Sequence, residues 1–204
     1  MPPSPADRAP FVTGLVLGAG GSTRLGRPKQ LLPYGDGTLL GHVVGVAREC
    51  RFDQTIVAIG GHVDEVRAGV ELTGAQVVVN KEYGEGCSSS IAAAIAAVDP
   101  GSELLVLMLG DQPGVGADTV RALLAGRGDA PLAACQYEDG RGHPFAFARE
   151  TYAALADLHG DKGVWRLLDQ RSAEVADVPI AGQVPRDVDT PDDYRAVLEA
   201  LTPT

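Results

Sequence analysis

The sequence is poor in cysteine. Its 204 residues include three cysteines, Cys50, Cys87 and Cys135, which lie far apart and form no Cys-x-x-Cys pair. This spacing indicates neither a zinc site nor a redox motif. Cys50 and Cys135 have apolar neighbours, so we expect them to pack as small hydrophobic side chains. An odd number of cysteines and no secretory leader favour reduced thiols and a cytoplasmic location.

Long apolar runs and an excess of positive charge are also missing. The longest uncharged stretch with a helical pattern, residues 87–98, is too short for a membrane span, which needs about 20 residues. The 17 Lys and Arg residues are outnumbered by 27 Asp and Glu residues, and the formal net charge is -10. Nucleic-acid-binding proteins usually carry a basic patch. Neither a membrane nor a nucleic acid is therefore an expected partner.

The composition fits one folded domain with a short tail. The chain is 45% hydrophobic, which is enough for a sizeable core at this length. Residues 1–10 contain four prolines and no apolar cluster. We therefore expect a disordered tail over residues 1–10 and a single domain over residues 11–204.

One stretch combines glycines with cations. The apolar run 15–17 predicts the end of a first strand, and residues 18–21 then supply three glycines. Glycine lets backbone N–H groups approach a ligand closely, and successive N–H groups form an anion-binding nest. Arg24, Arg27 and Lys29 add three positive charges within six residues. The stretch therefore predicts a phosphate-binding loop at a strand end.

Two better-known phosphate loops do not fit this stretch. A Walker A loop needs Gly-Lys-Ser/Thr after its second glycine, but Arg27-Pro28-Lys29 follows Gly26. A dinucleotide-binding fingerprint needs a third glycine and an acidic residue after the second strand. Thr23 stands in place of that glycine, and Gly60-Gly61-His62 follows the second predicted strand.

Strands and helices alternate along the chain. Apolar runs predict strands at residues 11–17, 55–59, 75–79, 104–109, 132–135 and 174–178. Helical spacing predicts helices at residues 39–50, 63–70, 91–98, 118–124, 151–158, 164–168 and 192–201, with Thr38 and Thr190 as N-caps and Pro191 at a first helical position. Residues 140–144 are expected as a turn before a strand at 145–147, which favours an antiparallel pair with 132–135. The pattern predicts an α/β fold, a three-layer sandwich on a mostly parallel, mixed sheet.

Several polar residues are candidates for a site. The most hydrophobic strand, 104–109, ends in Gly110-Asp111-Gln112-Pro113, and an aspartate there lies where open α/β sheets bind ligands. Asp111 is therefore a candidate metal ligand, with capping of the next helix as the alternative. Residues 88–90 are serines at a helix entry, where they cap backbone donors or hold a ligand. His143, beside a glycine turn, is a further candidate site residue.

Six blocks occur in order along the chain. They are Gly20-x-Ser22-x-Arg24-Leu25-Gly26-x-Pro28-Lys29, Gly86-Cys87-Ser88-Ser89-Ser90, Gly110-Asp111-Gln112-Pro113, Gly142-His143-Pro144, Gly160-Asp161-Lys162-Gly163 and Asp187-Val188-Asp189-Thr190-Pro191. Together they resemble the MobA-like NTP-transferase family, and especially its molybdenum cofactor cytidylyltransferase branch. The resemblance covers nearly all of the chain except the tail.

The resemblance implies a Rossmann-like nucleotidyltransferase fold. It implies transfer of CMP from CTP to the terminal phosphate of molybdopterin cofactor, with release of pyrophosphate, with Mg²⁺, and with an apo-molybdoenzyme as a further partner. The implied catalytic residues are Arg24, Lys29 and Asp111, and the implied metal ligands are Asp111 and Asp189. Contacts with the acceptor are implied for His143, Asp161 and Lys162. The implied nucleotide-binding residues are Leu17, Gly18, Ala19, Gly20, Gly21, Ser22, Arg24, Lys29, Gly86, Ser88, Ser89, Ser90 and Asp111.

One position departs from the family pattern. Members commonly have Leu-Ala-Ala-Gly in the loop and the guanylyl-transferring branch tends to Leu-Ala-Gly-Gly, whereas this chain has Leu17-Gly18-Ala19-Gly20. Ala19 favours CTP over GTP. The alternatives are a related transferase with another nucleotide or acceptor, an NAD(P)H-dependent reductase, and a non-catalytic chaperone for the cofactor. The missing dinucleotide fingerprint disfavours the reductase, and the intact Lys29, Asp111 and Asp189 favour catalysis.

Overall fold

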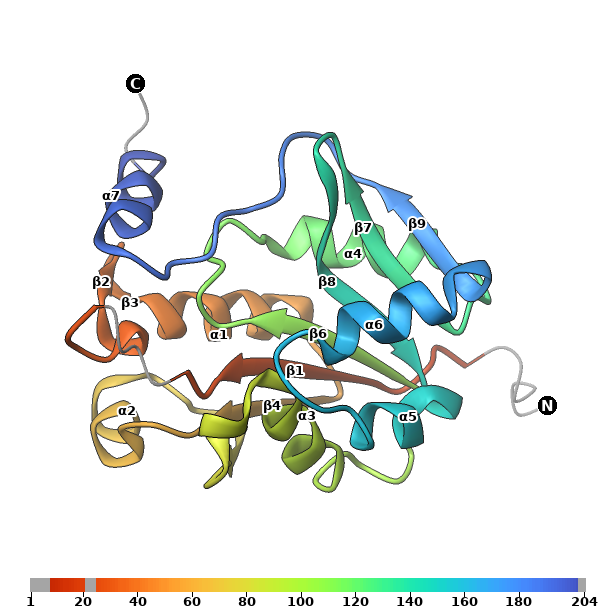
Figure 1. Ribbon diagram of the computed structural model, residues 1–204, viewed down its shortest axis with the longest axis horizontal. Helices are drawn as coiled ribbons and strands as arrows, with labels where there is room; N and C mark the ends of the chain where they lie inside the picture. Colours follow the sequence, from red (N-terminus) through yellow and green to blue (C-terminus); the bar gives the residue numbers. More distant parts are fainter. Residues whose placement is uncertain (1–7, 21–24, 202–204) are drawn as a thin grey trace.

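The computed structural model describes residues 8–20 and 25–201. A seven-stranded sheet with the order β5-β4-β1-β6-β8-β7-β9 forms its centre, and helices lie along it (Figure 1). Its strands are β1 (Val12–Gly18), β4 (Gln54–Ile59), β5 (Gln76–Val79), β6 (Leu104–Leu109), β7 (Leu132–Tyr137), β8 (Gly140–Ala148) and β9 (Val175–Pro179). The α-helices are α1 (Leu39–Cys50), α2 (Val63–Gly69), α3 (Cys87–Ile95), α4 (Ala117–Gly126), α5 (Tyr152–Ala156), α6 (Gly163–Gln170) and α7 (Pro191–Glu199).

The sheet is mixed, with one reversed strand. β8 runs antiparallel to both of its neighbours, β6 and β7, while the other pairings are parallel. The predicted α/β fold with a mostly parallel sheet is therefore confirmed. β1 and β6 pair side by side with Leu17 opposite Leu109, so their carboxyl ends meet at one edge of the sheet.

Side chains alternate between the two faces of the sheet and fill two large cores. On β1, Leu15 and Leu17 face one core and Val16 faces the other. Helices α3, α5 and α6 contribute to the first core, and α1, α2 and α4 contribute to the second. Strands covered on both faces have continuous apolar runs, which explains why the central strands could be predicted.

The two predicted N-caps are confirmed. Thr38 accepts a hydrogen bond from the Gly41 N–H at 3.2 Å at the start of α1. Thr190 forms a capping box with Asp193 at the start of α7, and Pro191 takes the first helical position. A small hairpin of β2 (Pro33–Tyr34) and β3 (Gly37–Thr38), which the sequence did not indicate, packs near α7.

The expected turn at residues 140–144 is wrong. These residues begin β8, because Tyr137 pairs with Gly140 and the reversal occurs at residues 138–139. A Cβ at Gly142 would lie 2.9 Å from Val184 Cγ1 and 3.0 Å from Tyr137 Cε2. The glycine therefore allows close packing beside the strand rather than a turn.

Most of the predicted tail lies outside the described residues. Arg8, where the described chain begins, donates to Glu103 Oε1 at 2.8 Å. The extent of a disordered tail and of a single domain stays a prediction. Within the described ranges, no helix is both long enough and apolar enough to cross a membrane.

Candidate active site

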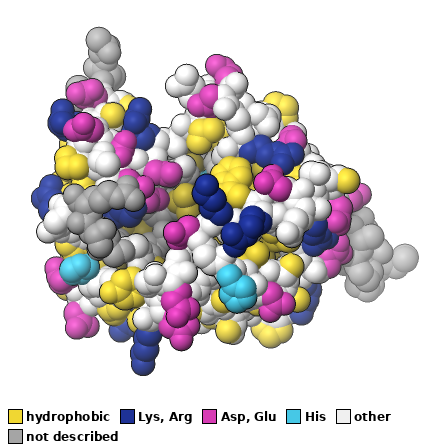
Figure 2. All heavy atoms as spheres, viewed as in Figure 1, with side chains coloured by type: hydrophobic (Ala, Val, Ile, Leu, Met, Phe, Trp, Pro, Cys, Tyr) yellow, Lys and Arg dark blue, Asp and Glu magenta, His cyan; other side chains and the backbone are white. Residues whose placement is uncertain are grey.

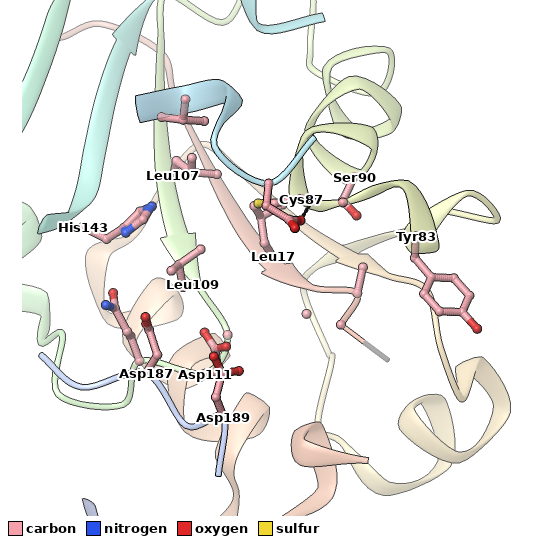
Figure 3. A pocket seen from close by; sticks show the side chains of 18 of the residues that line it. Leu17, Tyr83, Cys87, Ser90, Leu107, Leu109, Asp111, His143, Asp187 and Asp189 are labelled. Carbon is pink, nitrogen blue, oxygen red and sulfur yellow. Dashed lines mark hydrogen bonds between the residues drawn. The ribbon is translucent and has the colours of Figure 1, made fainter. Parts of the chain in front are cut away.

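A cleft of about 790 Å³ lies at the edge where the carboxyl ends of β1 and β6 meet. Open α/β sheets bind ligands at this edge. Figure 3 shows Asp111, Asp187 and Asp189 grouped on one side of the cleft, His143 near them and Ser90 across from them. On the molecular face seen in Figure 2, acidic and basic side chains lie around a hollow with hydrophobic side chains.

Lys29 joins two aspartates from distant parts of the chain. It begins the short 3-10 helix η2 (Lys29–Leu31), while Asp111 follows β6 and Asp189 precedes α7. The Lys29 ammonium donates to Asp111 Oδ2, and to Asp189 Oδ1 at 2.9 Å. The side chains of Lys29 and Asp111 are 14% and 19% exposed, so their contact is shielded from water. The structure thus brings together three residues that the sequence placed in one site.

Lys29 keeps its positive charge in this position. Burial alone would lower the pKa of Lys29, but the charges and hydrogen bonds of Asp111 and Asp189 outweigh burial and raise the pKa above its usual value. The ammonium is therefore protonated at neutral pH, as a contact for phosphate oxygens must be.

Neither aspartate caps a helix. Gly116 precedes α4, which has no side-chain cap, and Thr190 caps α7. The capping alternative for Asp111 is therefore wrong. The Asp111 carbonyl instead accepts from the Val188 N–H at 3.0 Å, and this bond holds the segment before α7 against the end of β6.

Asp187 is a third carboxylate in the cleft, and the sequence analysis gave it no role. Burial raises the pKa of Asp187 to about 6, and the negative charges of Asp111 and Asp189 add to the rise. The signal was the alternation in Asp187-Val188-Asp189, because Val188 is fully buried and the two aspartates that flank it line the cleft.

The first half of the predicted phosphate loop also lines the cleft. Residues 17–20 border it, directly beside Lys29. Gly21, Ser22 and Arg24 lie outside the described residues, so their predicted contacts with phosphate stay predictions. Gln30, which no motif indicated, donates through its amide to the carbonyls of Gly18 and Gly20.

The three predicted serines lie in the first turn of α3 rather than before it. Ser88 is 1% exposed, and its hydroxyl donates to the Gly160 carbonyl. The Ser89 hydroxyl donates to the Gly86 carbonyl at 2.8 Å. These two hydroxyls hold α3 to neighbouring loops. Ser90 lines the cleft together with Gly86, so these two are better placed than Ser88 and Ser89 for the predicted contact with a nucleotide.

Asp161 ties the loop before α6 to the start of α3. Its Oδ1 accepts from the Cys87 N–H at 3.1 Å, a favourable place for negative charge because it is a helix N-terminus. Asp161 lines the cleft, whereas Lys162, the next residue, does not. Burial raises the pKa of Cys87 to about 11, with further rises from Asp111 and Asp161, so this thiol stays protonated.

One wall of the cleft is aromatic and uncharged. His143 on β8 packs on Phe145 with ring centroids 4.1 Å apart, and Trp165 on α6 meets Phe145 edge to face at 5.1 Å. His143 and Trp165 line the cleft, and we call these two residues the aromatic wall. Burial lowers the pKa of His143 to about 3, so its imidazole is neutral at physiological pH. The structure thus places the predicted residue His143 in the cleft and adds Trp165, which no motif indicated.

The residues present fit a divalent metal that binds together with a nucleotide. Within residues 8–20 and 25–201, no group of three or more His, Cys, Asp or Glu side chains forms a metal-binding cluster. Mg²⁺ is usually held by one or two carboxylates plus substrate phosphates rather than by an all-protein cage. Asp111 and Asp189 converge on one ammonium group and are oxygen donors of the kind that magnesium and manganese prefer.

Comparison with known proteins agrees with this geometry. The sequence profile of the MobA-like NTP transferase domain matches residues 14–175. The chain therefore belongs to this family, and the resemblance inferred from its motifs is confirmed. The matched segment contains Lys29, Asp111 and His143, while Asp187 and Asp189 follow it.

Two relatives carry names for different activities. Nicotine blue oxidoreductase of Paenarthrobacter nicotinovorans is 32% identical over 171 residues, which cover 79% of this chain and 83% of that protein. Molybdenum cofactor cytidylyltransferase of Escherichia coli strain K12 is 25% identical over 198 residues, which cover 92% of this chain and 96% of that protein.

Solved structures from mycobacteria are more similar in sequence. The homologue of Mycobacterium tuberculosis Rv0371c from Mycobacterium sp. strain JC1 is 52% identical, with a TM-score of 0.89 over 94% of this chain and 96% of that chain. Rv0371c of M. tuberculosis H37Rv, in complex with manganese, is 46% identical, with a TM-score of 0.84 over 93% and 99% of the two chains.

Proposed function

We propose that this protein transfers CMP from CTP to the terminal phosphate of molybdopterin cofactor and releases pyrophosphate. The observation that carries the proposal is the charged end of the cleft, by which we mean Lys29, Asp111 and Asp189. These three residues meet beside residues 17–20, which we call the glycine loop. The family of the chain and its relative named as a molybdenum cofactor cytidylyltransferase support the same reaction. The product would pass to an apo-molybdoenzyme in the cytoplasm.

Asp111 and Asp189 are the residues that would hold Mg²⁺. When bound, the ion would neutralise charge on the triphosphate and on the acceptor phosphate, which otherwise repel each other. Rv0371c, a relative 46% identical to this chain, has been solved in complex with manganese, which supports the use of a hard divalent ion.

The other groups of the charged end bind and orient the triphosphate. Lys29 would contact phosphate oxygens through its ammonium, and N–H groups of the glycine loop would donate to them. The acceptor phosphate oxygen bonds to the α-phosphorus of CTP, and the bond from that phosphorus to the leaving pyrophosphate breaks. No side chain needs to remove a proton, because the acceptor phosphate is already anionic at neutral pH. Positioning and charge stabilisation are what such a transfer requires.

The aromatic wall suits the rest of the acceptor. His143 and Trp165 present an uncharged surface within the same cleft as the charged end. The ring system of a pterin can pack on such side chains, with its phosphate directed toward the charged end of the cleft. Asp161 lies on the cleft and remains a proposed acceptor contact, as does Lys162 beside it.

A second candidate is an NAD(P)H-dependent reductase. The observation in its favour is the 32% identity to a protein named nicotine blue oxidoreductase, which exceeds the 25% identity to the cytidylyltransferase. Against it stand the absent dinucleotide fingerprint and the convergence of Lys29 with two carboxylates, which a hydride transfer does not need.

A nucleotide panel tests the proposal and its alternative together. The purified protein is incubated with Mg²⁺ and CTP, GTP, ATP or UTP, with and without molybdopterin, and pyrophosphate is measured. We expect release with CTP that depends on molybdopterin. A parallel titration with NADPH should show no saturable binding. Pyrophosphate release with GTP but not CTP would refute the nucleotide assignment, and saturable NADPH binding with turnover of an electron acceptor would replace the proposed function by the reductase.

A further inference from the structure

We propose that Gln30 is a positioning residue for triphosphate binding, because its side-chain amide fixes the orientation of the glycine loop. The inference rests on the proposed function and extends it, because it names the residue that orients the N–H groups of the loop for phosphate binding. Gln30 is the residue after Lys29 in η2, and it is 2% exposed.

The Gln30 amide holds the loop at two points. Its Nε2 donates to the Gly18 carbonyl at 2.8 Å and to the Gly20 carbonyl at 2.8 Å. One NH₂ group has two hydrogens, so both are used on this loop. Both bonds come from the side-chain amide, so a shorter or apolar side chain cannot make them.

The carbonyls of Leu17 and Ala19, the other two residues of the loop, also accept hydrogen bonds from the protein. The Leu17 carbonyl accepts from the Gly110 N–H at 2.8 Å, and the Ala19 carbonyl accepts from the Gly61 N–H at 3.4 Å. All four carbonyls of residues 17–20 are therefore paired with protein donors. A carbonyl oxygen that faced a phosphate would repel it. The hydrogen bonds to protein donors hold these four carbonyl oxygens in other directions.

The direction of the carbonyls sets the direction of the N–H groups. In a trans peptide the C=O of one residue and the N–H of the next point in opposite directions. The Gly18 carbonyl points to buried Gln30, so the Ala19 N–H points away from Gln30. The Ala19 carbonyl points to Gly61, so the Gly20 N–H points away from Gly61. Residues 18–20 line the cleft, where such N–H groups form an anion nest.

Gln30 also connects the loop to the cation of the site. It directly follows Lys29, whose ammonium lies in the charged end of the cleft. One short helix thus carries both the residue that would contact phosphate by charge and the residue that holds the N–H donors in place. A change at Gln30 should therefore affect the phosphates of a nucleotide more than its base or ribose.

The chain offers a matched control at the opposite end of the sheet. Gln54, at the start of β4, also uses its amide to join separate segments, because Nε2 donates to the Ala97 carbonyl at 2.9 Å and Oε1 accepts from the Asp99 N–H at 2.8 Å. Gln54→Met should lower stability in the same way as Gln30→Met without touching the cleft.

The test compares a triphosphate with its monophosphate. Binding of CTP and CMP, and of GTP and GMP as a second pair, is measured by calorimetry with Mg²⁺ for the wild type, Gln30→Met, Gln30→Glu and Gln54→Met, with a thermal melt of each. Gln30→Glu keeps the size of the side chain and, in its protonated form, has one donor hydrogen where the amide has two, so it serves if the methionine variant does not fold. We expect either Gln30 variant to lose about tenfold or more in triphosphate affinity and to keep its monophosphate affinity within about twofold. Gln54→Met should keep both affinities.

Each other outcome overturns the inference. If the wild type binds CTP and a folded Gln30 variant binds it equally well, the positioning role is wrong and the proposed function stands. If the variant loses triphosphate and monophosphate affinity equally, or if Gln54→Met shows the same selective loss, Gln30 has only a structural role. If the wild type binds no nucleoside triphosphate, the proposed function fails and the inference fails with it.

Discussion

The charged end and the aromatic wall of the cleft differ in the charge and the type of their side chains. Lys29 follows the glycine loop, Asp111 follows β6 and Asp189 precedes α7. The Lys29 ammonium pairs with both carboxylates. His143 and Trp165 come from β8 and α6 and carry no charge at neutral pH. In the proposed function the first region performs the transfer from the nucleoside triphosphate, and the second region contacts the acceptor.

This proposed division of roles would account for relatives with different names. The chain is similar both to a protein named as a cytidylyltransferase and to one named as an oxidoreductase. If the charged end performs the chemistry and the aromatic wall selects the acceptor, variants of the two regions should affect different measured quantities.

Removing a carboxylate from the charged end should have the largest effect. Asp111→Asn or Asp189→Asn should lower turnover roughly 10²- to 10³-fold, because charge-stabilising contacts are worth about 3–4 kcal/mol. CTP affinity should change less, since Lys29 and the loop remain. Steady-state kinetics and a thermal melt on the same samples measure this. Asp118→Asn, whose side chain is 99% exposed, is the control. Normal turnover in a destabilised Asp111 variant would show that the carboxylate is structural.

Removing the cation should weaken nucleotide binding and turnover together. Lys29→Met loses a charged hydrogen-bond donor to phosphate, so CTP affinity and kcat/KM should both fall about 10- to 100-fold. Lys81→Met, at an exposed lysine outside the cleft, should leave both unchanged. Calorimetry with CTP and initial rates check the prediction, and an unchanged CTP affinity in the Lys29 variant would contradict it.

The buried imidazole of the aromatic wall should make stability depend on pH. The pKa of His143 is about 3 in the folded state and about 6.5 in the unfolded state. Below pH 6.5 the unfolded state therefore binds a proton that the folded state does not, so stability is lost as pH falls. Between pH 7 and pH 5 the wild type should lose up to about 2 kcal/mol more than His143→Gln. Urea denaturation across this range measures the difference, and parallel slopes would show that His143 is not shielded.

The smallest effect is expected at Trp165. Trp165→Ala should lower affinity for the acceptor roughly 3- to 10-fold, because an aromatic contact is worth about 0.5–1.5 kcal/mol beyond its area. Trp165→Phe should restore most of the loss, and CTP affinity should not change in either variant. A fall in CTP affinity with unchanged acceptor affinity would place Trp165 at the nucleotide and break the division of the cleft into two regions.

The charged end could be predicted largely from the sequence, while of the aromatic wall only His143 could be predicted. Asp111 follows a strand buried on both faces, and Asp189 precedes a helix with a strong capping signal, so both positions have local signatures. Trp165 reaches the cleft only because α6 packs beside β8, and nothing in its neighbourhood signals that contact. Gln30 follows a motif lysine, but its partners are carbonyls 10 and 12 residues earlier, which depend on the path of the loop.

The errors have the same origin. Residues 140–144 have the glycines of a turn, but Gly142 is small because Val184 and Tyr137 pack against it. Ser88 has the composition of a cap, but its hydroxyl donates to the Gly160 carbonyl of a loop distant in the sequence. Local patterns identify which residue types are unusual, whereas the long-range packing decides what they do.

The most direct test of the account follows the α-phosphorus of CTP. CTP labelled at that atom is mixed with Mg²⁺, molybdopterin and either the wild type or Asp111→Asn, and the products of a single turnover are separated. The account predicts that the wild type moves the label onto molybdopterin with one pyrophosphate released for each label transferred, and that Asp111→Asn does so roughly 10²- to 10³-fold more slowly. Label that remains in CTP, or that appears only as free CMP whether or not molybdopterin is present, would contradict it.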